Sequence, residues 1–345
     1  MRFIHTADWH LGNRFHEIDR TEETKAFFEW LKNQIEEKQA QALIVSGDIF
    51  DVTNPSSEAQ SLFYTFLASM KNSVCKNIII TGGNHDSAQR LEIAKDLAAL
   101  NNIHIVGSIN NLKPEDMVFE LLDSENKACG IAAAVPFARE IELQSYLKDN
   151  EQAEENCNEA QNTKSFSDRT FGALYEQVFK AAEKLRAGRE IPVIAMGHLY
   201  AADLEGRLAY ADSREKTDDG VKVIDPVGNL GNVHSEIFPK GFDYVALGHI
   251  HYTTMVAKNP SIRYSGSPFI LGFDEAALPK YVLCVDVNYS KPSELPEYPE
   301  VEKLKVPEFI NFKRISGSLE EIKQSLQKLS GQSFTKKLYV DLCYK

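Results

Sequence analysis

The sequence contains few cysteines and no long apolar run. Its five cysteines, Cys75, Cys129, Cys157, Cys284 and Cys343, are scattered, and no two form a Cys-x-x-Cys pair. This spacing argues against a thiolate zinc site or a disulfide framework and favours reduced thiols in the cytoplasm. No apolar stretch approaches the roughly 20 residues that a membrane helix needs, and the N-terminus lacks the apolar core of a secretory signal. We therefore expect a cytoplasmic globular protein with no membrane segment.

An excess of basic residues is also missing. The chain carries 38 Lys and Arg against 50 Asp and Glu, which gives a net charge of −12. Because affinity for the phosphate backbone comes largely from Lys and Arg, this balance by itself argues against DNA binding. What is present is an ordinary globular mixture, with 43% hydrophobic and 26% charged residues in a chain of 345. That length is enough for one large domain and a small one.

Short apolar runs alternate with helical stretches over the first two-thirds of the chain, and this alternation predicts an α/β layered fold. We expect strands at Arg2–Thr6, Ala42–Ser46, Asn77–Thr81, Ile103–Val106, Gly130–Ala134, Ile191–Met196, Tyr244–Leu247, Arg263–Ser265 and Tyr281–Val287. Helices are expected at Thr21–Lys38, after a cap at Asn54-Pro55, and after a cap at Ser87. The apolar stripes of these helices, such as Leu91, Ala94, Leu97 and Leu100, predict core-facing sides, with a dimer contact as the alternative.

Composition divides the rest of the chain. Asp149–Arg169 is polar and predicts a surface loop or insertion, and Ala201–Lys240 is rich in glycine and charge. Residues 290–307 are rich in Pro and Glu, which predicts a linker between a large domain at 1–289 and a small one at 308–345. In the small domain we expect a strand, a helix and a strand at Phe309–Ile315, Leu319–Leu329 and Lys337–Leu342. The chain stops shortly after that strand, which leaves open whether the natural protein continues beyond it.

Five short polar motifs each follow an apolar, strand-like run. They are Asp8-Trp9-His10, Gly47-Asp48-Ile49-Phe50-Asp51, Gly83-Asn84-His85-Asp86, Gly197-His198 and Gly248-His249-Ile250-His251. In open α/β sheets, ligands bind beyond the carboxyl ends of the strands, and glycine there allows a close approach of the backbone. Extended backbone in Asp8-x-His10 and His249-x-His251 would place both side chains of each pair on one side. We therefore expect the motifs to converge.

The residue types in these motifs suit metal ions. Carboxylate, amide and imidazole ligands without thiolate favour Mn²⁺, with Fe or Zn as alternatives. Seven ligands are too many for one ion, so we expect two ions that share a bridging carboxylate. One ion is assigned Asp8, His10, Asp48 and His251, and the other Asp48, Asn84, His198 and His249. Each motif alone is an ordinary turn, but clustered carboxylates and imidazoles without a cation would be costly.

The ordered motifs resemble the calcineurin-like metallophosphoesterase superfamily. The segments "FIHTADWHLG", "VSGDIFD", "TGGNHDS", "AMGHL", "ALGHIH" and "YSGSP" are similar to the SbcD family, the nuclease subunits of bacterial SbcCD complexes. The resemblance is strong over residues 1–274 and weaker over the tail, which resembles the family's DNA-capping domain. It implies a β-sandwich core flanked by helices, followed by a small α+β capping domain.

The resemblance also implies an activity. Two cations roughly 3.5–4 Å apart can clamp a phosphodiester and activate a water. We expect His85 to stabilise the transition state or protonate the leaving 3′-oxygen, and Asp51 to orient His85. Archaeal and eukaryotic relatives carry a second histidine where this chain has Asp51, so the resemblance implies an Asp51–His85 pairing here.

The family implies exonuclease action on double-stranded DNA and endonuclease action on single-stranded or hairpin DNA, in end processing, recombination and repair. It further implies an SbcC-like ABC-type ATPase partner, which would share DNA binding, and a homodimer within a heterotetramer. Among dispersed basic residues, Arg14 and Arg139 are the candidate DNA contacts, with Arg20, Arg169, Arg207 and Arg214 as further candidates.

Two other functions stay open at this point. The first is a phosphoprotein phosphatase or cyclic-nucleotide phosphodiesterase on the same site. Val52-Thr53 after Asp51 argue against the phosphatases, which carry Arg-Gly there. The second is a non-catalytic scaffold at DNA ends, which the complete set of ligand motifs and His85 disfavours.

Overall fold

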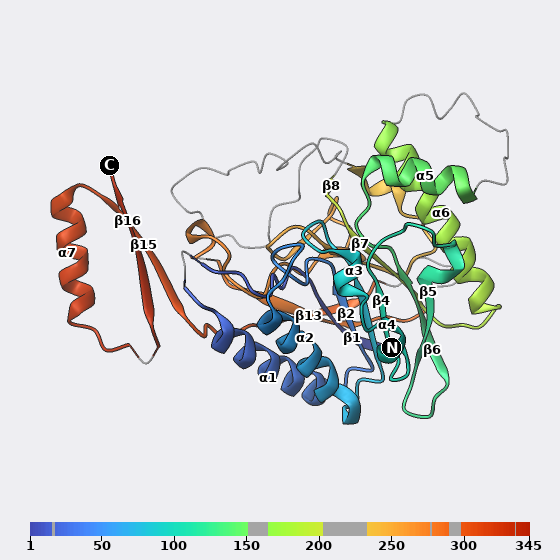
Figure 1. Cartoon of the computed structure of the whole chain (residues 1–345), viewed down its shortest axis with the longest axis horizontal. Helices are drawn as coiled ribbons and strands as arrows, with labels where there is room; N and C mark the ends of the chain where they lie inside the picture. Colours follow the sequence, from blue (N-terminus) through green and yellow to red (C-terminus); the bar gives the residue numbers. More distant parts are fainter. Residues whose placement is uncertain (16–17, 151–164, 203–232, 277, 290–297, 335) are drawn as a thin grey trace.

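The computed structural model describes residues 1–15, 18–150, 165–202, 233–276, 278–289, 298–334 and 336–345. Its main part is a sandwich of two six-stranded sheets covered by helices (Figure 1). The first sheet runs β14 (Glu300–Lys305), β13 (Tyr281–Asp286), β1 (Arg2–Thr6), β2 (Ala42–Ser46), β3 (Asn77–Thr81) and β4 (Ile103–Val106). The second runs β11 (Thr254–Met255), β12 (Ile262–Tyr264), β10 (Tyr244–Gly248), β7 (Val193–His198), β6 (Ala128–Ala134) and β5 (Val118–Leu122). The predicted α/β fold with a β-sandwich core is confirmed.

Four neighbouring strands of each sheet run parallel, and this places their carboxyl ends at a common edge. In the first sheet these are β1 to β4, and in the second they are β12, β10, β7 and β6. Antiparallel strands flank both groups. Since side chains at strand ends meet at such an edge, the order of the strands brings remote parts of the sequence together.

The central strands are buried on both faces, which explains their nearly continuous apolar sequence. In β2, Ala42 and Ile44 face the second sheet, whereas Leu43 and Val45 face the helices on the outside. Those helices are α1 (Thr21–Lys38) and α2 (Ser57–Ser69). Alternate residues of one strand therefore belong to two different cores.

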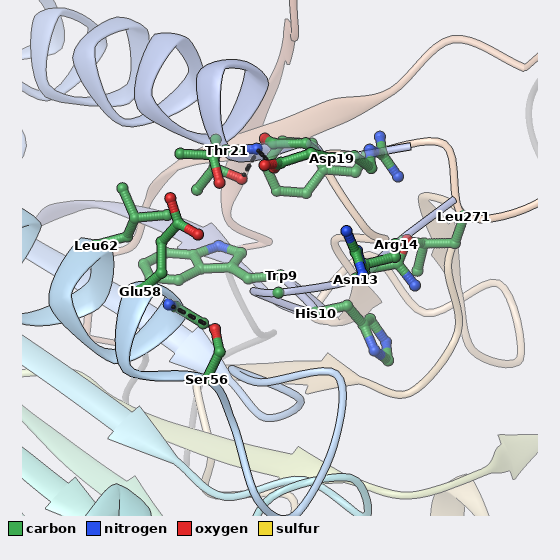
Figure 2. A pocket seen from close by; sticks show the side chains of 15 residues that line it. Trp9, His10, Asn13, Arg14, Asp19, Thr21, Ser56, Glu58, Leu62 and Leu271 are labelled. Atoms are coloured by element: carbon green, nitrogen blue, oxygen red, sulfur yellow. Dashed lines mark hydrogen bonds between the residues drawn. The ribbon is translucent and has the colours of Figure 1, made fainter. Parts of the chain in front are cut away.

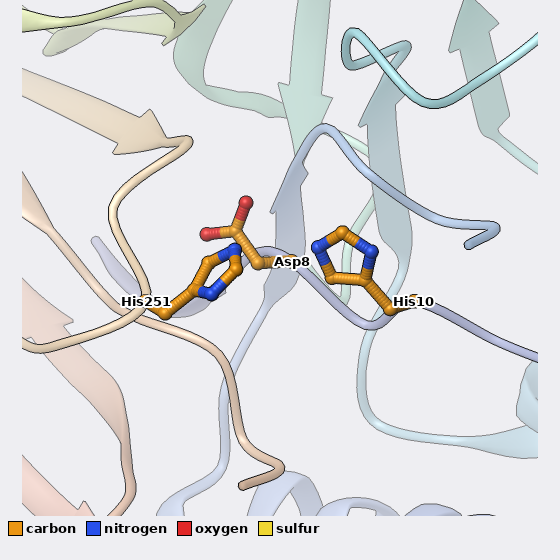
Figure 3. A group of neighbouring side chains, drawn as sticks. All are labelled: Asp8, His10 and His251. Carbon is orange, nitrogen blue, oxygen red and sulfur yellow. The ribbon is translucent and has the colours of Figure 1, made fainter. Parts of the chain in front are cut away.

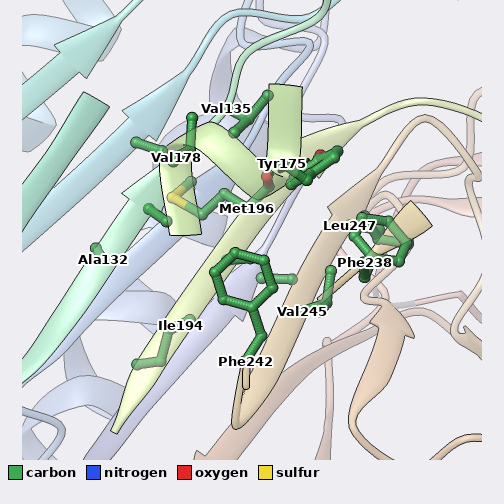
Figure 4. Packing of buried hydrophobic residues seen from close by; sticks show 14 of the residues in the cluster. Ala132, Val135, Tyr175, Val178, Ile194, Met196, Phe238, Phe242, Val245 and Leu247 are labelled. Carbon is green, nitrogen blue, oxygen red and sulfur yellow. Dashed lines mark hydrogen bonds between the residues drawn. The ribbon is translucent and has the colours of Figure 1, made fainter. Parts of the chain in front are cut away.

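The outer face of the second sheet is covered by α6 (Phe166–Arg186), against which α5 (Glu140–Asn150) packs. Figure 4 shows Tyr175 and Val178 of α6 among apolar side chains of β7 and β10. The Tyr175 hydroxyl donates to the carbonyl of Met196 at 3.1 Å, so its polar atom is satisfied inside the core. This face of the sheet is thereby covered, and the Tyr175 hydroxyl is satisfied within it.

The start of α2 differs from the sequence expectation. The cap is Ser56 and not Asn54, because the Ser56 hydroxyl accepts a hydrogen bond from Ala59 N–H at 3.1 Å. Pro55 lies just outside the helix. A serine that bonds the third residue of the first turn satisfies one of the free N–H groups, and this fixes the helix start.

The helix expected after Ser87 is broken into two short ones, α3 (Ala88–Leu91) and α4 (Lys95–Ala99). Leu91 is buried, but Ile93, Leu97 and Leu100 are 65%, 68% and 80% exposed. The prediction that this stripe faces the core is therefore wrong beyond Leu91. Helical spacing identifies an apolar side but does not say what covers it.

The C-terminal part contains a separate small unit, visible at the left of Figure 1. It consists of β15 (Asn311–Gly317), α7 (Leu319–Ser330) and β16 (Leu338–Tyr344), with a core around Ile315, Ile322 and Leu329. Of the expected linker, Glu300–Lys305 form β14 and pair with β13, while residues 290–297 lie outside the described residues. The charged sequence of β14 is explained by its place at the sheet edge. The domain boundaries themselves stay a prediction.

Several short elements complete the described chain. They are β8 (Ala201–Ala202), β9 (Val233–His234), and the 3-10 turns η1 (Met70–Asn72), η2 (Pro114–Met117), η4 (Ser235–Ile237) and η5 (Phe273–Glu275). Cys75, Cys129, Cys284 and Cys343 are free thiols, and Cys157 lies outside the described residues. Among the described helices, none combines the length and apolar character needed to cross a bilayer.

Candidate metal centre

The structure gathers all seven predicted ligand side chains at one edge of the sandwich. Asp8 and His10 follow β1, Asp48 follows β2, Asn84 follows β3, His198 ends β7, and His249 and His251 follow β10. Donor atoms of Asp8, His10 and His251 lie within 4.8 Å of one another, as do those of Asp8, Asp48 and His198. Asn84 and His249 join this cluster through the contacts described below. The predicted convergence of the strand ends is present.

Four of these residues have a backbone conformation that is rare outside glycine. The φ angles of Asp8, His10, Asp48 and His249 are 54°, 45°, 49° and 98°. The assumption of extended backbone in Asp8-x-His10 and His249-x-His251 was therefore wrong, although all four side chains reach the cluster. Hydrogen bonds from Asp8 N–H to Gly47 O and from His10 N–H to Asp48 O, both 3.0 Å, hold the two loops together. Such strained residues cost about 1–3 kcal/mol each and concentrate at functional sites.

One half of the cluster is formed around Asp8, with His251 and His10 on either side of its carboxylate (Figure 3). Asp8 Oδ1 accepts the N–H of His249 at 2.9 Å. Asp8 Oδ2 and His10 Nε2 are buried and have no hydrogen-bond partner. Buried polar atoms are normally satisfied, so two neighbouring unsatisfied ligand atoms indicate a place for a cation.

The other half is formed around Asp48 and Asn84. Asp48 Oδ2 lies 3.3 Å from His198 Nε2 and 3.6 Å from His10 Nε2, between the two halves of the cluster. Asn84 Oδ1 lies 3.0 Å from His198 Nε2 and 3.1 Å from His249 Nδ1. Asp48 is therefore placed where a bridging carboxylate would have to be, and the amide oxygen of Asn84 faces two imidazoles.

The protonation of His198 tests whether a metal fits here. Its Nδ1 is 2.9 Å from the carbonyl of Ser46, to which only a protonated Nδ1 can donate. Its Nε2, facing Asp48 and Asn84, then carries a proton only in the cationic form. Although burial opposes it, Asp48 and Asp8 raise the pKa of His198 to about 9. A metal ion at Nε2 would replace that proton and compensate the same carboxylates.

The charges of the cluster lead to the same conclusion. Burial and repulsion by Asp48 raise the pKa of Asp8, although the nearby histidines lower it. Both carboxylates are buried, with Asp8 and Asp48 only 0% and 2% exposed. A divalent cation relieves this cost, and a donor set of only oxygen and nitrogen suits Mn²⁺, Fe²⁺ or Zn²⁺. The residues present therefore fit two such ions.

His85 lies at the exposed side of the cluster, and its ring centroid is 4.9 Å from that of His10. The predicted pairing with Asp51 takes a different form: His85 Nδ1 contacts the main-chain carbonyl of Asp51 at 2.8 Å. The Asp51 carboxylate instead accepts from Asn13 Nδ2 at 3.0 Å and lies 3.2 Å from His10 Nδ1. The carbonyl thus fixes the ring of His85, and a carboxylate oxygen of Asp51 lies within 4.8 Å of one of its ring nitrogens.

Sequence reasoning missed residues that are not ligands themselves but hold the ligands or their loops in place. The Asp86 carboxylate accepts from the N–H groups of Ile49, Phe50 and Gly83, at 2.9 to 3.0 Å, and so ties two ligand loops together. Burial and Asp48 raise the pKa of Asp86 to about 6. Because Asp86 directly follows His85 in a ligand motif, the sequence already contained a signal for its supporting role. Glu275, which contacts His251, follows no comparable motif.

A cavity of about 220 Å³ opens beside His10 (Figure 2). Arg14, exposed, lines it together with Asn13, Glu58 and Leu62. Arg20 also lines the cavity but is 5% exposed and pairs with Glu23 at 2.6 Å, so it is a poor candidate for a DNA contact.

The remaining candidate DNA contacts are spread over the surface. Arg139 is exposed two residues after Phe137, whose ring centroid is 6.3 Å from that of His198. Arg169 is exposed on α6, whereas Arg207 and Arg214 lie outside the described residues.

Addition of Mn²⁺ is expected to stabilise the chain against heat. Each ion that binds only the folded state contributes about 2.7 kcal/mol at a concentration one hundred times its dissociation constant. Differential scanning calorimetry with Mn²⁺ and with a chelator measures this difference. An unchanged transition at millimolar Mn²⁺ contradicts a metal centre formed by these residues.

A fold of two facing mixed sheets, with this ligand set at the strand ends, defines a metal-dependent phosphoesterase. The family model described as calcineurin-like phosphoesterase matches residues 1–253. The chain belongs to this family and, within it, to the SbcD family, the nuclease chains of bacterial SbcCD. It is therefore an enzyme that hydrolyses phosphodiesters with the help of metal ions.

The relatives that place it there match over most of the chain, and all three are described as the SbcD chain of the nuclease SbcCD. The protein from Escherichia coli strain K12 is 30% identical over 345 residues, which cover 99% of this chain and 77% of the relative. The protein from Rhodobacter capsulatus is 30% identical over 313 residues, covering 89% and 72%. The protein from Bacillus subtilis strain 168 is 28% identical over 324 residues, covering 93% and 74%.

Proposed function

We propose that the chain is a DNA nuclease that cuts double-stranded DNA from its ends and single-stranded or hairpin DNA internally. The observation that carries this proposal is the buried cluster of unsatisfied ligand atoms at the strand ends, with the exposed His85 beside it. The name of the relatives, which describes them as part of a nuclease, supports DNA as the substrate class. Processing of DNA ends in recombination and repair follows from that activity.

The seven side chains divide between two ions as the distances suggest. Asp8, His10 and His251 would hold one ion, and Asn84, His198 and His249 the other, with Asp48 between them. When bound, two divalent ions supply charge that neutralises a phosphodiester and lowers the pKa of water. The native metal is proposed to be Mn²⁺, with Fe and Zn as alternatives.

His85 is proposed to act on the substrate directly. Its Nδ1 donates to the carbonyl of Asp51, which leaves Nε2 as the atom available to the substrate. From there a protonated Nε2 would give its proton to the leaving 3′-oxygen. The exposed position of His85, beside buried ligands, suits a group that contacts a bound phosphodiester.

The test is a cleavage assay with hairpin, single-stranded and blunt duplex DNA in Mn²⁺, with and without the ATPase partner and ATP. We expect cleavage of all three with the partner, and metal-dependent hydrolysis of bis-p-nitrophenyl phosphate by the chain alone. Hydrolysis of the small ester without cleavage of any DNA, even with the partner, would contradict the nuclease proposal and leave a general phosphodiesterase.

An ATPase partner of the ABC type is proposed to share DNA binding with this chain. The net charge of −12 argues against a strong duplex-binding surface formed by this chain alone. The relatives are named as parts of a complex, which supports a partner. The ATPase would hold the duplex and deliver its end to the metal centre.

A homodimer is proposed to form through the exposed apolar side chains of the broken helix. Ile93, Leu97 and Leu100 lie within one short segment and are each at least 65% exposed. Water contact of several large apolar side chains in one place is typical of a protein interface. The homodimer would bring two metal centres into one assembly with two ATPase chains.

The double substitution Leu97→Glu/Leu100→Glu is expected to convert this dimer into a monomer without unfolding it, because both side chains are exposed. Light scattering on a size-exclusion column measures the mass. Ile141→Glu is the matched control, because it changes an apolar side chain of the same size that is 74% exposed on α5. It should leave the mass unchanged. A dimer that persists in the double variant contradicts this interface.

A further inference from the structure

A buried ion pair lies directly behind one of the ligand histidines. Lys280 is 7% exposed, and its Nζ contacts Glu275 Oε2 at 2.5 Å. The other oxygen of this carboxylate, Oε1, lies 3.3 Å from His251 Nδ1. Lys280 Nζ also donates to the main-chain carbonyl of His251 at 3.1 Å. The pair therefore holds both the ring and the backbone of one residue.

We propose that Glu275, held by Lys280, is a positioning residue that orients His251 for metal binding. The proposal deepens the proposed function and rests on the same metal centre. A carboxylate beside Nδ1 keeps the proton of the imidazole on that atom, so the lone pair is on Nε2. Donation of Nδ1–H to a carboxylate also makes a ligating histidine more basic, and loss of such a partner typically weakens metal binding about 10- to 100-fold.

Lys280 gives the carboxylate a fixed place and charge. Its Nζ lies 2.5 Å from Oε2, and the two side chains are only 7% and 17% exposed, so little water competes for the carboxylate. The N–H of Leu271 also donates to Oε2 at 3.1 Å, which leaves Oε1 to face His251. One oxygen is thus held by two donors, and the other is directed at the imidazole.

The segment that carries Glu275 is itself packed in place. Phe273, in the same 3-10 turn η5, has its ring centroid 4.8 Å from that of Phe15 and 6.0 Å from that of Phe312. Phe312 belongs to β15 of the small C-terminal unit. Aromatic contacts from two other parts of the chain therefore fix the turn, as precise support of a metal ligand requires.

Another ligand histidine is held by a main-chain atom. His198 Nδ1 is held by the main-chain carbonyl of Ser46, which no substitution removes. His251 depends on two side chains, so its support can be removed without altering the backbone. The competing explanation is that the ion pair only stabilises the loop between Leu271 and Lys280. Under that explanation, folding would suffer and metal affinity would not.

The experiment compares Glu275→Gln and the double variant Glu275→Gln/Lys280→Met with the wild-type chain. The double variant removes both charges at similar volume, so no unpaired charge is left buried, as Lys280 would be in the single variant. Glu183→Gln is the matched control, because Glu183 pairs at 2.7 Å with Arg186, which is 8% exposed near the end of α6. Calorimetric titration with Mn²⁺ gives the affinity of each site, and thermal unfolding gives stability.

We expect one Mn²⁺ to bind about 10- to 100-fold more weakly in either Glu275 variant that folds, with the second within about twofold of wild type. At substoichiometric metal, electron paramagnetic resonance should then show more of the signal of isolated Mn²⁺. Unchanged affinities in a folded variant, or an equal loss in Glu183→Gln, would overturn the proposal. Hydrolysis of bis-p-nitrophenyl phosphate by the wild-type chain tests the proposed function separately, since Mn²⁺ binding is measured without substrate.

Discussion

Replacing Asp48 by alanine is expected to remove both metal ions and to lower phosphodiester hydrolysis by at least about 10³-fold. Asp48 Oδ2 lies 3.3 Å from His198 Nε2 and 3.6 Å from His10 Nε2, so this carboxylate belongs to both halves of the cluster. Metal ions lower the activation free energy of such reactions by several kcal/mol. Because each 1.36 kcal/mol corresponds to about a tenfold change in rate, loss of both ions removes several factors of ten. Elemental analysis of the purified variant measures the metal content.

The controls separate the charge of Asp48 from its structural contacts. Asp48 Oδ1 accepts the N–H of His85 at 2.9 Å, a bond that Asp48→Asn can retain, so loss of metal in that variant reports the missing charge. Asp286→Ala removes a surface carboxylate that pairs with Arg2, at the opposite end of β1 from Asp8, and should leave both ions bound. Two metals per chain in Asp48→Ala would exclude the bridging assignment.

Replacing His85 by glutamine is expected to keep both metals and to lower hydrolysis by about 10²- to 10⁴-fold. His85 contacts the cluster through its neighbours, since its main-chain N–H bonds Asp48 and its Nδ1 bonds the carbonyl of Asp51. It is not required to fill either ligand set. A proton donor or transition-state contact in this position contributes an effect of that size.

The measurement combines the metal content with turnover of bis-p-nitrophenyl phosphate and of hairpin DNA. His104→Gln is the matched control: this histidine is half-buried on β4, stacks on Phe119 and lies outside the cluster. It should retain nearly full turnover. Wild-type activity in His85→Gln would refute the role given to His85, and loss of metal in that variant would make it a ligand instead.

The sequence predicted the elements that depend on local patterns. Apolar runs such as Ala42–Ser46 and Asn77–Thr81 are buried on both faces, and their ends are marked by glycine and polar residues, so the strands were found with the same bounds. The segment after Ser87 failed because helical spacing describes one side of a helix and not its neighbours. Leu97 and Leu100 fit the spacing, but no other element of the described chain covers them.

The site shows the same division between local and long-range information. Asp51 was correctly associated with His85, but the pairing atom is a main-chain oxygen, which no residue type encodes. The positive φ values of Asp8 and Asp48 were missed for a similar reason. They arise from hydrogen bonds between loops about forty residues apart, and a single residue type does not reveal such bonds.

The sequence alone determined the α/β class, the strand ends and the types of residue that gather as ligands, because each depends on local periodicity or on the chemistry of single side chains. Only the tertiary structure decided which buried atoms have no partner and which side chains support the ligands. Glu275 and Lys280 reach His251 through the path of one loop, and that path is fixed by Phe273 packing on Phe15 and Phe312. Such contacts depend on the packing of remote segments, which no local pattern records.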